Sequence, residues 1–288
     1  MSAQDLTNLL LIGISQGCAY GLVALGFVLI YKATEIVNFS HGEFMMLGAF
    51  AALPLIGLFG FWMGIACAIL AMAVVGFLLD ALVMRRIIGE SQASVFILTV
   101  AFGFIFRSLA GMAWGWDAIP FPNHFGGSLQ IGGLAVRHDR IAIIAGTALL
   151  CLGLYLFFSR SRVGIAMQAA SQNQLAAYYM SIPVKTLVSV VWALGAAVAA
   201  AAGIFNAPFT QVDTHLGAFG LKALAGAIVG GFGSIPGALL GCLLIGVLEP
   251  FADLYLPSLK GVSAYIVMLA VLFVRPEGLI AQTFAKKV

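Results

Sequence analysis

Long runs of apolar residues, interrupted by short charged or proline-containing breaks, recur along the whole chain. A helix needs about 20 residues to cross about 30 Å of hydrocarbon. Runs of about that length predict transmembrane helices over residues 9–31, 44–60, 61–79, 95–113, 141–158, 186–205 and 255–274. We therefore expect an all-α fold, a polytopic transmembrane helical bundle.

The composition agrees with a lipid environment. The 288 residues are 62% hydrophobic and 9% charged, whereas roughly a quarter of the residues of a soluble domain are charged. The 14 Lys and Arg residues are scattered between apolar runs, which does not indicate a nucleic-acid-binding face. The four cysteines lie far apart, without metal-ligand spacing. We expect a single transmembrane domain over residues 1–288, with membrane lipid as its solvent and the first apolar run retained as a helix.

Positive charges predict the orientation, because Lys and Arg accumulate on cytoplasmic loops. With the N-terminus outside, nine of the 14 lie in the cytoplasm, Arg107 lies within a span, and four lie outside: Arg137, Arg140, Lys222 and Lys260. The opposite orientation would invert this bias. We therefore expect a periplasmic N-terminus and a cytoplasmic C-terminus.

The glycine-rich stretch over residues 220–249 should cross the membrane an even number of times. A single crossing there would place Arg275 and the C-terminal lysines outside. We expect a hairpin or two short, re-entrant helices, which brings the total to roughly eight to ten spans. The turn should fall where glycine and proline break the helix, at Gly230, Gly231, Gly233, Ser234, Ile235, Pro236 and Gly237. Glycines at four-residue spacing elsewhere predict close helix packing, with a hinge as the alternative.

A polar cluster between the first two spans, Asn38 to Glu43, opens an apolar helix. His41 and Glu43 could be metal ligands or an acid/base pair, but the sequence has no third ligand at a recognisable spacing. Asn38 or Ser40 could instead cap the helix, with Glu43 in its first turn. A third interpretation places the cluster at the cytoplasmic mouth of a pathway, since polar groups at membrane depth usually face protein or water.

Two other charged residues lie in or near spans. Arg107 should face the bundle interior or extend to the outer surface, and the neighbouring Trp114 and Trp116 favour the outer surface. Asp80 is close to Arg85 in sequence and is interpreted as a residue at the cytoplasmic end of its span.

Residues 159–185 form a long segment that begins with polar residues and is rich in Ala, Gln and Met. They predict a short helix at the membrane surface, ended by Ser181 to Pro183. The segment is either an interfacial connector or a coupling helix that transmits motion from a soluble partner.

Four motifs in this chain resemble the branched-chain amino acid permease family of ATP-binding-cassette importers. They are NFSHGEFMMLGAF at 38–50, GIAMQAASQNQLAAYYMSIPV at 164–184, GLKALAGAIVGGFGSIPGALLGCLLIGVLE at 220–249 and RPEGL at 275–279. The resemblance covers nearly the whole chain, and the motifs occur in the family order.

The resemblance implies a permease in the bacterial inner membrane that works with a sister permease, two cytoplasmic ATPase subunits and a periplasmic solute-binding protein. ATP and Mg would be bound by the ATPase subunits, and no cofactor by this chain, which contains no Gly-Lys-Ser or Gly-Lys-Thr of a phosphate-binding loop. The ATPase contact is expected at the coupling loop, residues 159–185, with the candidates Arg162, Gly164, Gln168, Ala170 and Asn173. Gln168 stands where many relatives have arginine. The pathway or gate candidates are Asn38, His41, Glu43, Gly230, Gly231, Gly233, Ser234 and Pro236.

The expected function is ATP-driven import of branched-chain amino acids, with docking of the binding protein on the outer loops 114–140 and 207–216. Urea, short amides or another small polar solute are alternative cargoes for the same architecture. A self-sufficient channel or proton-coupled carrier is an alternative of another class, although the predicted spans hold few of the acids or polar filters that it needs. We do not expect an enzyme, because no nucleophile or metal partner accompanies the histidines.

Overall fold

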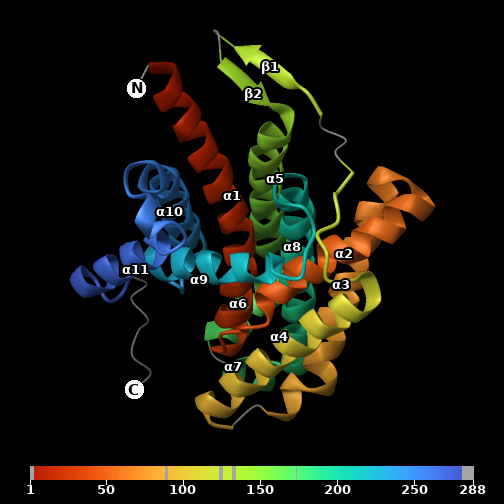
Figure 1. The fold of residues 1–288 in the computed structure, drawn as a ribbon. Coiled ribbons are helices and arrows are strands. Elements are labelled where there is room, and N and C mark those ends of the chain that lie inside the picture. The colour runs from red at the N-terminus through yellow and green to blue at the C-terminus, as the bar shows by residue number, and fades with distance from the viewer. Residues whose placement is uncertain (1–2, 88–89, 123–125, 132–133, 173, 281–288) are drawn as a thin grey trace.

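The structure is a computed structural model that describes residues 3–87, 90–122, 126–131, 134–172 and 174–280 (Figure 1). Among these residues, seven helices are long and apolar enough to cross a membrane. They are α1 (Ala3–Thr34), α2 (His41–Phe59), α3 (Phe61–Leu82), α4 (Gln92–Trp114), α5 (His138–Arg160), α8 (Val184–Thr210) and α10 (Ile235–Tyr255). The prediction of an all-α bundle is confirmed.

Shorter elements complete the chain. The remaining helices are η1 (Met84–Arg86), α6 (Arg162–Gln172), α7 (Gln174–Tyr179), η2 (Leu216–Ala218), α9 (Phe219–Gly230), η3 (Pro257–Leu259) and α11 (Ser263–Val274). Strands β1 (Ser128–Ile131) and β2 (Leu134–Arg137) form an antiparallel hairpin between α4 and α5, which hydropathy alone did not predict. In Figure 1 this hairpin and the start of α1 lie at the upper end, and α7 and the α3–α4 connection lie at the lower end.

Small residues let α1 and α10 pack closely and antiparallel. A Cβ on Gly13 would lie 2.7 Å from Val247 Cα, and one on Gly17 would lie 2.8 Å from Leu243 Cα. Residues with side chains would hold the helix backbones further apart, so dispersion contacts between them depend on these glycines. The packing function expected for the glycine repeat is therefore confirmed.

The helices form two sets with the same arrangement. Helix α1 leads into α2 and packs on α10, while α8 leads into α9 and packs on α3. The second helix of each set also contacts the two helices that follow it: α2 contacts α3 and α4, and α9 contacts α10 and α11. Figure 1 shows α1 descending and α8 ascending, so the second set is inverted relative to the first. Inverted repeats of this kind place two related helix starts at the middle of a bundle.

The last third of the chain differs from the prediction in three ways. The turn at 231–234 lies where it was expected, but α10 has 21 residues and is a full-length span rather than a short helix. The predicted span over 255–274 is wrong, because α10 ends at Tyr255 and the next α-helix, α11, begins only at Ser263. Helix α11 has 12 residues, about 18 Å of helix, which is too short to cross the membrane. Lys222 lies in α9 rather than in an outer loop.

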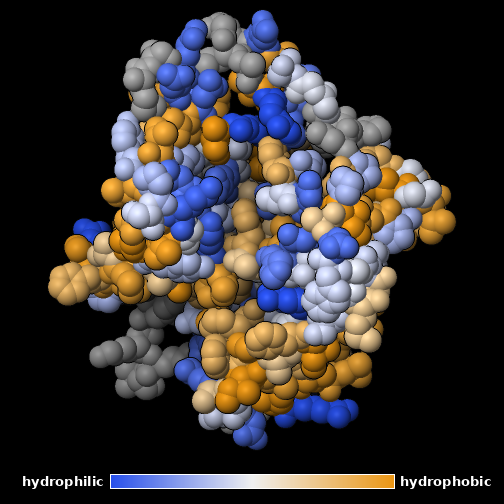
Figure 2. Space-filling model, viewed as in Figure 1, coloured by the Kyte–Doolittle hydropathy of each residue, from blue (hydrophilic) through white to orange (hydrophobic). Residues whose placement is uncertain are grey.

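The surface carries the hydropathy pattern expected of a bundle in lipid. Figure 2 shows hydrophobic side chains gathered over α3 and α4 in the lower part of the view and over α11. Large apolar side chains are well exposed there, for example Leu70 and Phe104, both at 65%. Hydrophilic side chains occupy a zone across the middle of the same face. This zone lies between apolar surfaces and cannot be solvated by hydrocarbon.

Candidate functional site

Two helix starts meet inside the bundle, one from each set. Before α2, Asn38 Oδ1 accepts hydrogen bonds from the Ser40 backbone N (3.1 Å) and Oγ (2.7 Å). Before η2, Asp213 Oδ1 accepts one from the His215 backbone N (2.9 Å). Both segments are therefore Asx turns that reverse the chain ahead of a helix.

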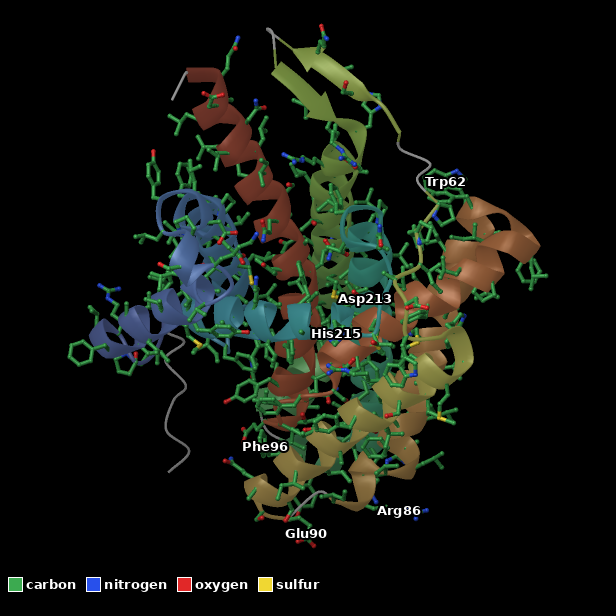
Figure 3. All side chains as sticks on the ribbon, viewed as in Figure 1. Trp62, Arg86, Glu90, Phe96, Asp213 and His215 are labelled. Carbon is green, nitrogen blue, oxygen red and sulfur yellow. The ribbon has the colours of Figure 1, made fainter. Side chains whose placement is uncertain are left out.

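The two starts touch through glycine. Gly42 packs so closely on Gly217 and Gly220 that a Cβ on Gly42 would overlap the Gly217 carbonyl. Figure 3 shows Asp213 and His215 at mid-height in the molecule, far from Arg86 and Glu90 at its lower end. The meeting point of the two sets is thus near the middle of the bundle.

Glu43 forms a salt bridge with Arg107 across this meeting point. Arg107 Nη2 donates a hydrogen bond of 2.6 Å to Glu43 Oε1, and the Arg107 and Glu43 side chains are 31% and 9% exposed. The interpretation that Arg107 extends to the outer surface is wrong, because its charge is satisfied by a carboxylate 64 positions earlier. The ion pair ties α2 to α4.

A second buried ion pair holds α9. Lys222 of α9 donates a short hydrogen bond to Glu249 Oε1 of α10. The other oxygen, Oε2, accepts from Tyr20 Oη at 2.6 Å and from Gln16 Nε2 at 2.9 Å, both in α1. The two helices that start inside the bundle, α2 and α9, are therefore each joined by an ion pair to a full-length helix, α4 and α10 respectively. Charges at membrane depth are costly unless each has a partner of opposite charge.

One of the three interpretations placed the Asn38–Glu43 cluster at the cytoplasmic mouth of a pathway, whereas the structure places it inside the bundle. His41 is fully buried, with its ring 4.5 Å from that of Phe27, and it fills a notch at Gly26 of α1. Gly26 precedes the end of α1 by eight residues, about 12 Å of helix. Ser40 is the N-cap residue, but its side chain does not cap the helix and instead bonds Asn38.

The glycine turn follows the C-terminal end of α9, apart from the Asn38 cluster, which contacts the start of that helix. Its Phe232 ring is 4.7 Å from that of Tyr31, near the end of α1. Gly231 has φ +105°, a backbone conformation that other residues rarely adopt. Ser234 Oγ accepts a hydrogen bond from Gly237 N at 3.2 Å and caps α10, with Pro236 in its first turn. Gly230, Gly231, Gly233, Ser234 and Pro236 thus form one turn that does not join Asn38, His41 and Glu43.

The segment over 159–185 forms two helices, α6 and α7, at the lower end. Gly164 and Ala170 face the bundle, and a Cβ on Gly164 would lie 2.7 Å from Phe158 Cα. Arg162 and Gln168 are exposed, and Gln168 Nε2 donates to Phe158 O at 3.3 Å. Asn173 lies outside the described residues. Apolar side chains are also exposed on this segment, namely Ile165 (52%), Tyr179 (76%) and Met180 (77%).

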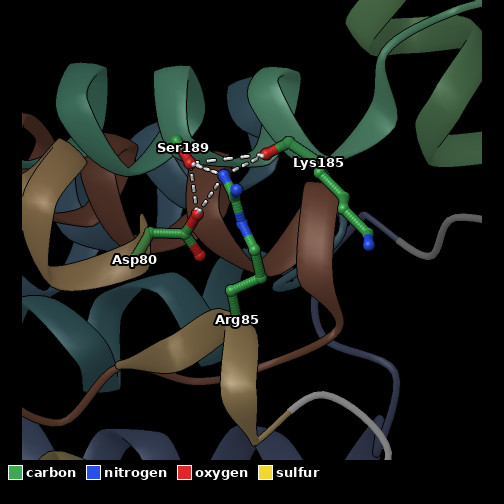
Figure 4. Close-up of polar contacts among 4 residues, drawn as sticks. All are labelled: Asp80, Arg85, Lys185 and Ser189. Atoms are coloured by element: carbon green, nitrogen blue, oxygen red, sulfur yellow. Dashed lines mark hydrogen bonds and ion pairs between the residues drawn. The ribbon is translucent and has the colours of Figure 1, made fainter. Parts of the chain in front are cut away.

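A polar clamp connects the end of this segment to α3 (Figure 4). Arg85 Nη2 donates to Ser189 Oγ at 2.6 Å and to Lys185 O at 3.0 Å. Ser189 Oγ in turn donates to Asp80 Oδ2 at 2.6 Å, and Arg85 lies 3.9 Å from that oxygen. Asp80 and Arg85, close in sequence, are thus also an ion pair in the structure. Because α8 follows α7 directly, a displacement of α6 and α7 would move α8 and, through the clamp, α3.

These features define a transport subunit of the membrane: seven apolar spans, related helix starts with charge pairs at mid-depth, and an exposed helical segment at one end. The model of the family described as "Branched-chain amino acid transport system / permease component" matches residues 9–273, and the chain belongs to this family. It is therefore a non-catalytic permease subunit of an ATP-binding-cassette importer, a class that in general works with ATPase and binding-protein partners. Within the described residues, no group of three or more His, Cys, Asp or Glu could hold a metal ion.

Curated relatives align over most of their length. The chain is 30% identical to the high-affinity branched-chain amino acid transport system permease protein BraD of Pseudomonas aeruginosa, over 99% of this chain and 97% of that protein. It is 28% identical to LivH of Salmonella typhimurium, over 96% of each. It is also 28% identical to the autoinducer 2 import system permease protein LsrD of Salmonella paratyphi B, over 84% of this chain and 75% of that one. Among solved structures, PsaBC from Streptococcus pneumoniae in complex with Fab matches with a TM-score of 0.46 and 14% identity, over 91% of this chain and 89% of that one.

Sequence reasoning missed the partners of the charged residues. It also took residues 207–216 as an outer loop, and so missed that this segment leads into η2 and α9. Asp213-Thr214-His215 resembles Asn38-Phe39-Ser40-His41 in placing a short acceptor side chain before a histidine and a helix start. That similarity, together with a lysine and a glutamate in the apolar stretch 220–249, was the signal available.

Proposed function

We propose that this chain imports branched-chain amino acids through a polar pathway that it shares with a sister permease. The supporting observation is the hydrophilic zone at mid-depth in Figure 2. His215 and Gln211 are exposed there, Asp213 is half-buried, and the Arg107 side chain is 31% exposed. Polar groups at this depth need protein or water beside them. A second permease covering this face would supply both.

Movement of the pathway would begin at α6 and α7. Their exposed apolar residues form a surface that a soluble ATPase could bind, and the clamp of Asp80, Arg85 and Ser189 links that surface to α3 and α8. ATP and the binding protein must each bind the two conformations with different affinity, because a ligand with equal affinity shifts nothing. We propose two ATPase subunits, which bind ATP and Mg, at this end.

The orientation follows from the same proposal. The end that carries α6 and α7 would face the cytoplasm, and the end with the β1–β2 hairpin would face the periplasm and receive the loaded binding protein. The 114–140 region is retained as the docking surface. The 207–216 region is not, because after Thr210 the chain turns inward toward the Gly42 contact.

The test is uptake by proteoliposomes that contain this chain with its ATPase, sister permease and binding protein. We expect radiolabelled leucine to enter only when ATP and binding protein are both present, and unlabelled leucine to compete better than urea or ribose. Uptake without ATP or binding protein would contradict an importer mechanism and favour a channel or carrier. Competition by urea rather than leucine would keep the mechanism and change the cargo.

A further inference from the structure

A cavity of about 200 Å³ lies toward the upper end of the bundle, between α1, α5, α8 and the start of α9. This volume is well above the roughly 10–15 Å³ that a single water needs by the same measure, so the cavity has room for several waters or one small organic solute. Its walls combine apolar side chains with a few polar ones. The residues that matter below are Gln16, Arg140, Ile143, Asn206 and Phe209.

Arg140 brings to this cavity a guanidinium group that forms no salt bridge among the described residues. The nearest acid, Asp139, is taken by Arg137, whose Nε and Nη2 lie 3.0 and 2.5 Å from Asp139 Oδ2. Arg140 reaches Asp139 only through its backbone N, at 2.8 Å. In the part of the chain that the structure describes, the Arg140 guanidinium has no salt bridge, which leaves its fork of donors for an acceptor in the cavity.

Asn206 adds a second unused donor. Its side chain lines the cavity, the residue is 5% exposed, and its Nδ2 is buried with no hydrogen-bond partner among the described residues. A buried donor without a partner is unfavourable, so it favours any occupant that accepts a hydrogen bond. The guanidinium and the amide together suit an anionic oxygen group, above all a carboxylate.

Gln16 supplies a hydrogen-bond acceptor, whereas Arg140 and Asn206 supply donors. Both hydrogens of its amide are engaged, since Nε2 donates to Tyr20 Oη at 3.0 Å and to Glu249 Oε2 at 2.9 Å. This arrangement fixes the amide so that its oxygen, Oε1, is the group left to accept. An ammonium group on the occupant could donate to it. Ile143 and Phe209 then provide an apolar wall for a hydrocarbon side chain.

We propose that this cavity is a receiving site for an α-amino acid with an apolar side chain, held by its carboxylate at Arg140 and Asn206 and by its ammonium group at Gln16. The site rests on the proposed function and adds to it, because the permease itself would then distinguish zwitterions from uncharged solutes such as amides and urea. Gln16 also connects the occupant to α9, because Gln16 donates a hydrogen bond to Glu249 and Glu249 accepts one from Lys222 of α9.

The test is equilibrium binding to the assembled permease–ATPase complex in lipid nanodiscs, without the binding protein. The probes are L-leucine, L-leucinamide, which lacks the carboxylate charge, and urea. We expect leucine to bind more tightly than leucinamide, and Arg140→Gln to weaken leucine by between about 10- and 100-fold, the range for a lost charged hydrogen bond. Leucinamide binding should change little, so the ratio of the two affinities is a readout that partial misfolding would not imitate.

Two controls keep the result specific. Lys260→Gln removes a cation that does not line the cavity, and should leave both affinities unchanged. Arg140→Lys should recover part of the preference for leucine. Equal binding of leucine and leucinamide by the unaltered complex, or an unchanged ratio in Arg140→Gln, would overturn the proposal. If ATP-driven leucine uptake persists while the ratio is unchanged, only the receiving site fails; if no uptake of any amino acid occurs, the proposed function fails.

Discussion

The close packing of α1 on α10 can be tested by adding single methyl groups to α1. In Gly17→Ala, the new Cβ would lie 2.8 Å from Leu243 Cα, whereas ordinary contact begins at 3.4 Å. The helices must therefore separate by about 0.6 Å, and a gap of about 0.5–1 Å already costs a quarter to a half of each dispersion contact. Overpacking of this kind costs about 1–3 kcal/mol.

Helix propensity works in the opposite direction and gives the matched control. Alanine is favoured over glycine within a helix by about 1 kcal/mol. At Gly153 of α5, no atom lies within 4 Å of the position that a Cβ would take, so Gly153→Ala should receive this gain without a clash. We expect Gly17→Ala to have a free energy of unfolding about 1–3 kcal/mol below that of Gly153→Ala. Gly13→Ala/Gly17→Ala should cost less than the sum of its singles, since one helix separation relieves both clashes.

The assay is SDS-driven unfolding of the purified chain, followed by tryptophan fluorescence and helical circular dichroism, with the free energy of unfolding compared between variants. If Gly17→Ala proved as stable as Gly153→Ala, α1 and α10 would not pack as described. Full additivity of the two α1 substitutions would also contradict a shared separation.

Three further predictions concern charge, coupling and orientation. Glu43→Gln should lower the free energy of unfolding by about 1.5–3 kcal/mol by leaving Arg107 unpaired, and adding Arg107→Gln should recover part of the loss, as a double-mutant cycle would measure; a double variant less stable than Glu43→Gln would argue against the pair. Ile165→Glu on the exposed face of α6 should abolish stimulation of the partner ATPase, while Gln92→Glu, exposed at the start of α4 and outside residues 159–185, should not; equal ATPase rates in both variants would exclude this face as the contact. Ser128→Cys and Ser159→Cys, exposed at opposite ends, should react with a membrane-impermeant thiol reagent from the periplasm and the cytoplasm respectively, and the reverse pattern would invert the proposed orientation.

The spans were predictable because hydrocarbon thickness fixes their length, and six of the predicted ranges overlap long helices. The break after Tyr255 was missed although Pro257, Lys260 and Gly261 stand there, because apolar residues lie on both sides of it. Hydropathy averages over a window and does not register such a break. The glycine turn was predicted because Gly231 needs positive φ, a local property of the backbone.

The candidate site was predicted only in part. Local sequence identified Asn38 and His41 as unusual, but it could not supply the partner of Glu43, which lies 64 positions away in α4. The same holds for Lys222 and Glu249, separated by 27 positions and a glycine turn. Charge pairs between helices depend on which faces meet, and a single sequence does not contain that information.

The contact between α1 and α10 joins the first helix of the chain to one of the last. During synthesis, α1 therefore enters the membrane long before its partner exists, with its glycine face open to lipid or to other proteins. The nascent subunit cannot close its core until about residue 250 has been inserted, because Glu249 must also reach Gln16 and Tyr20. Products that stop short of α10 would keep that face uncovered, which gives the membrane's proteases a structural mark by which to recognise unfinished copies.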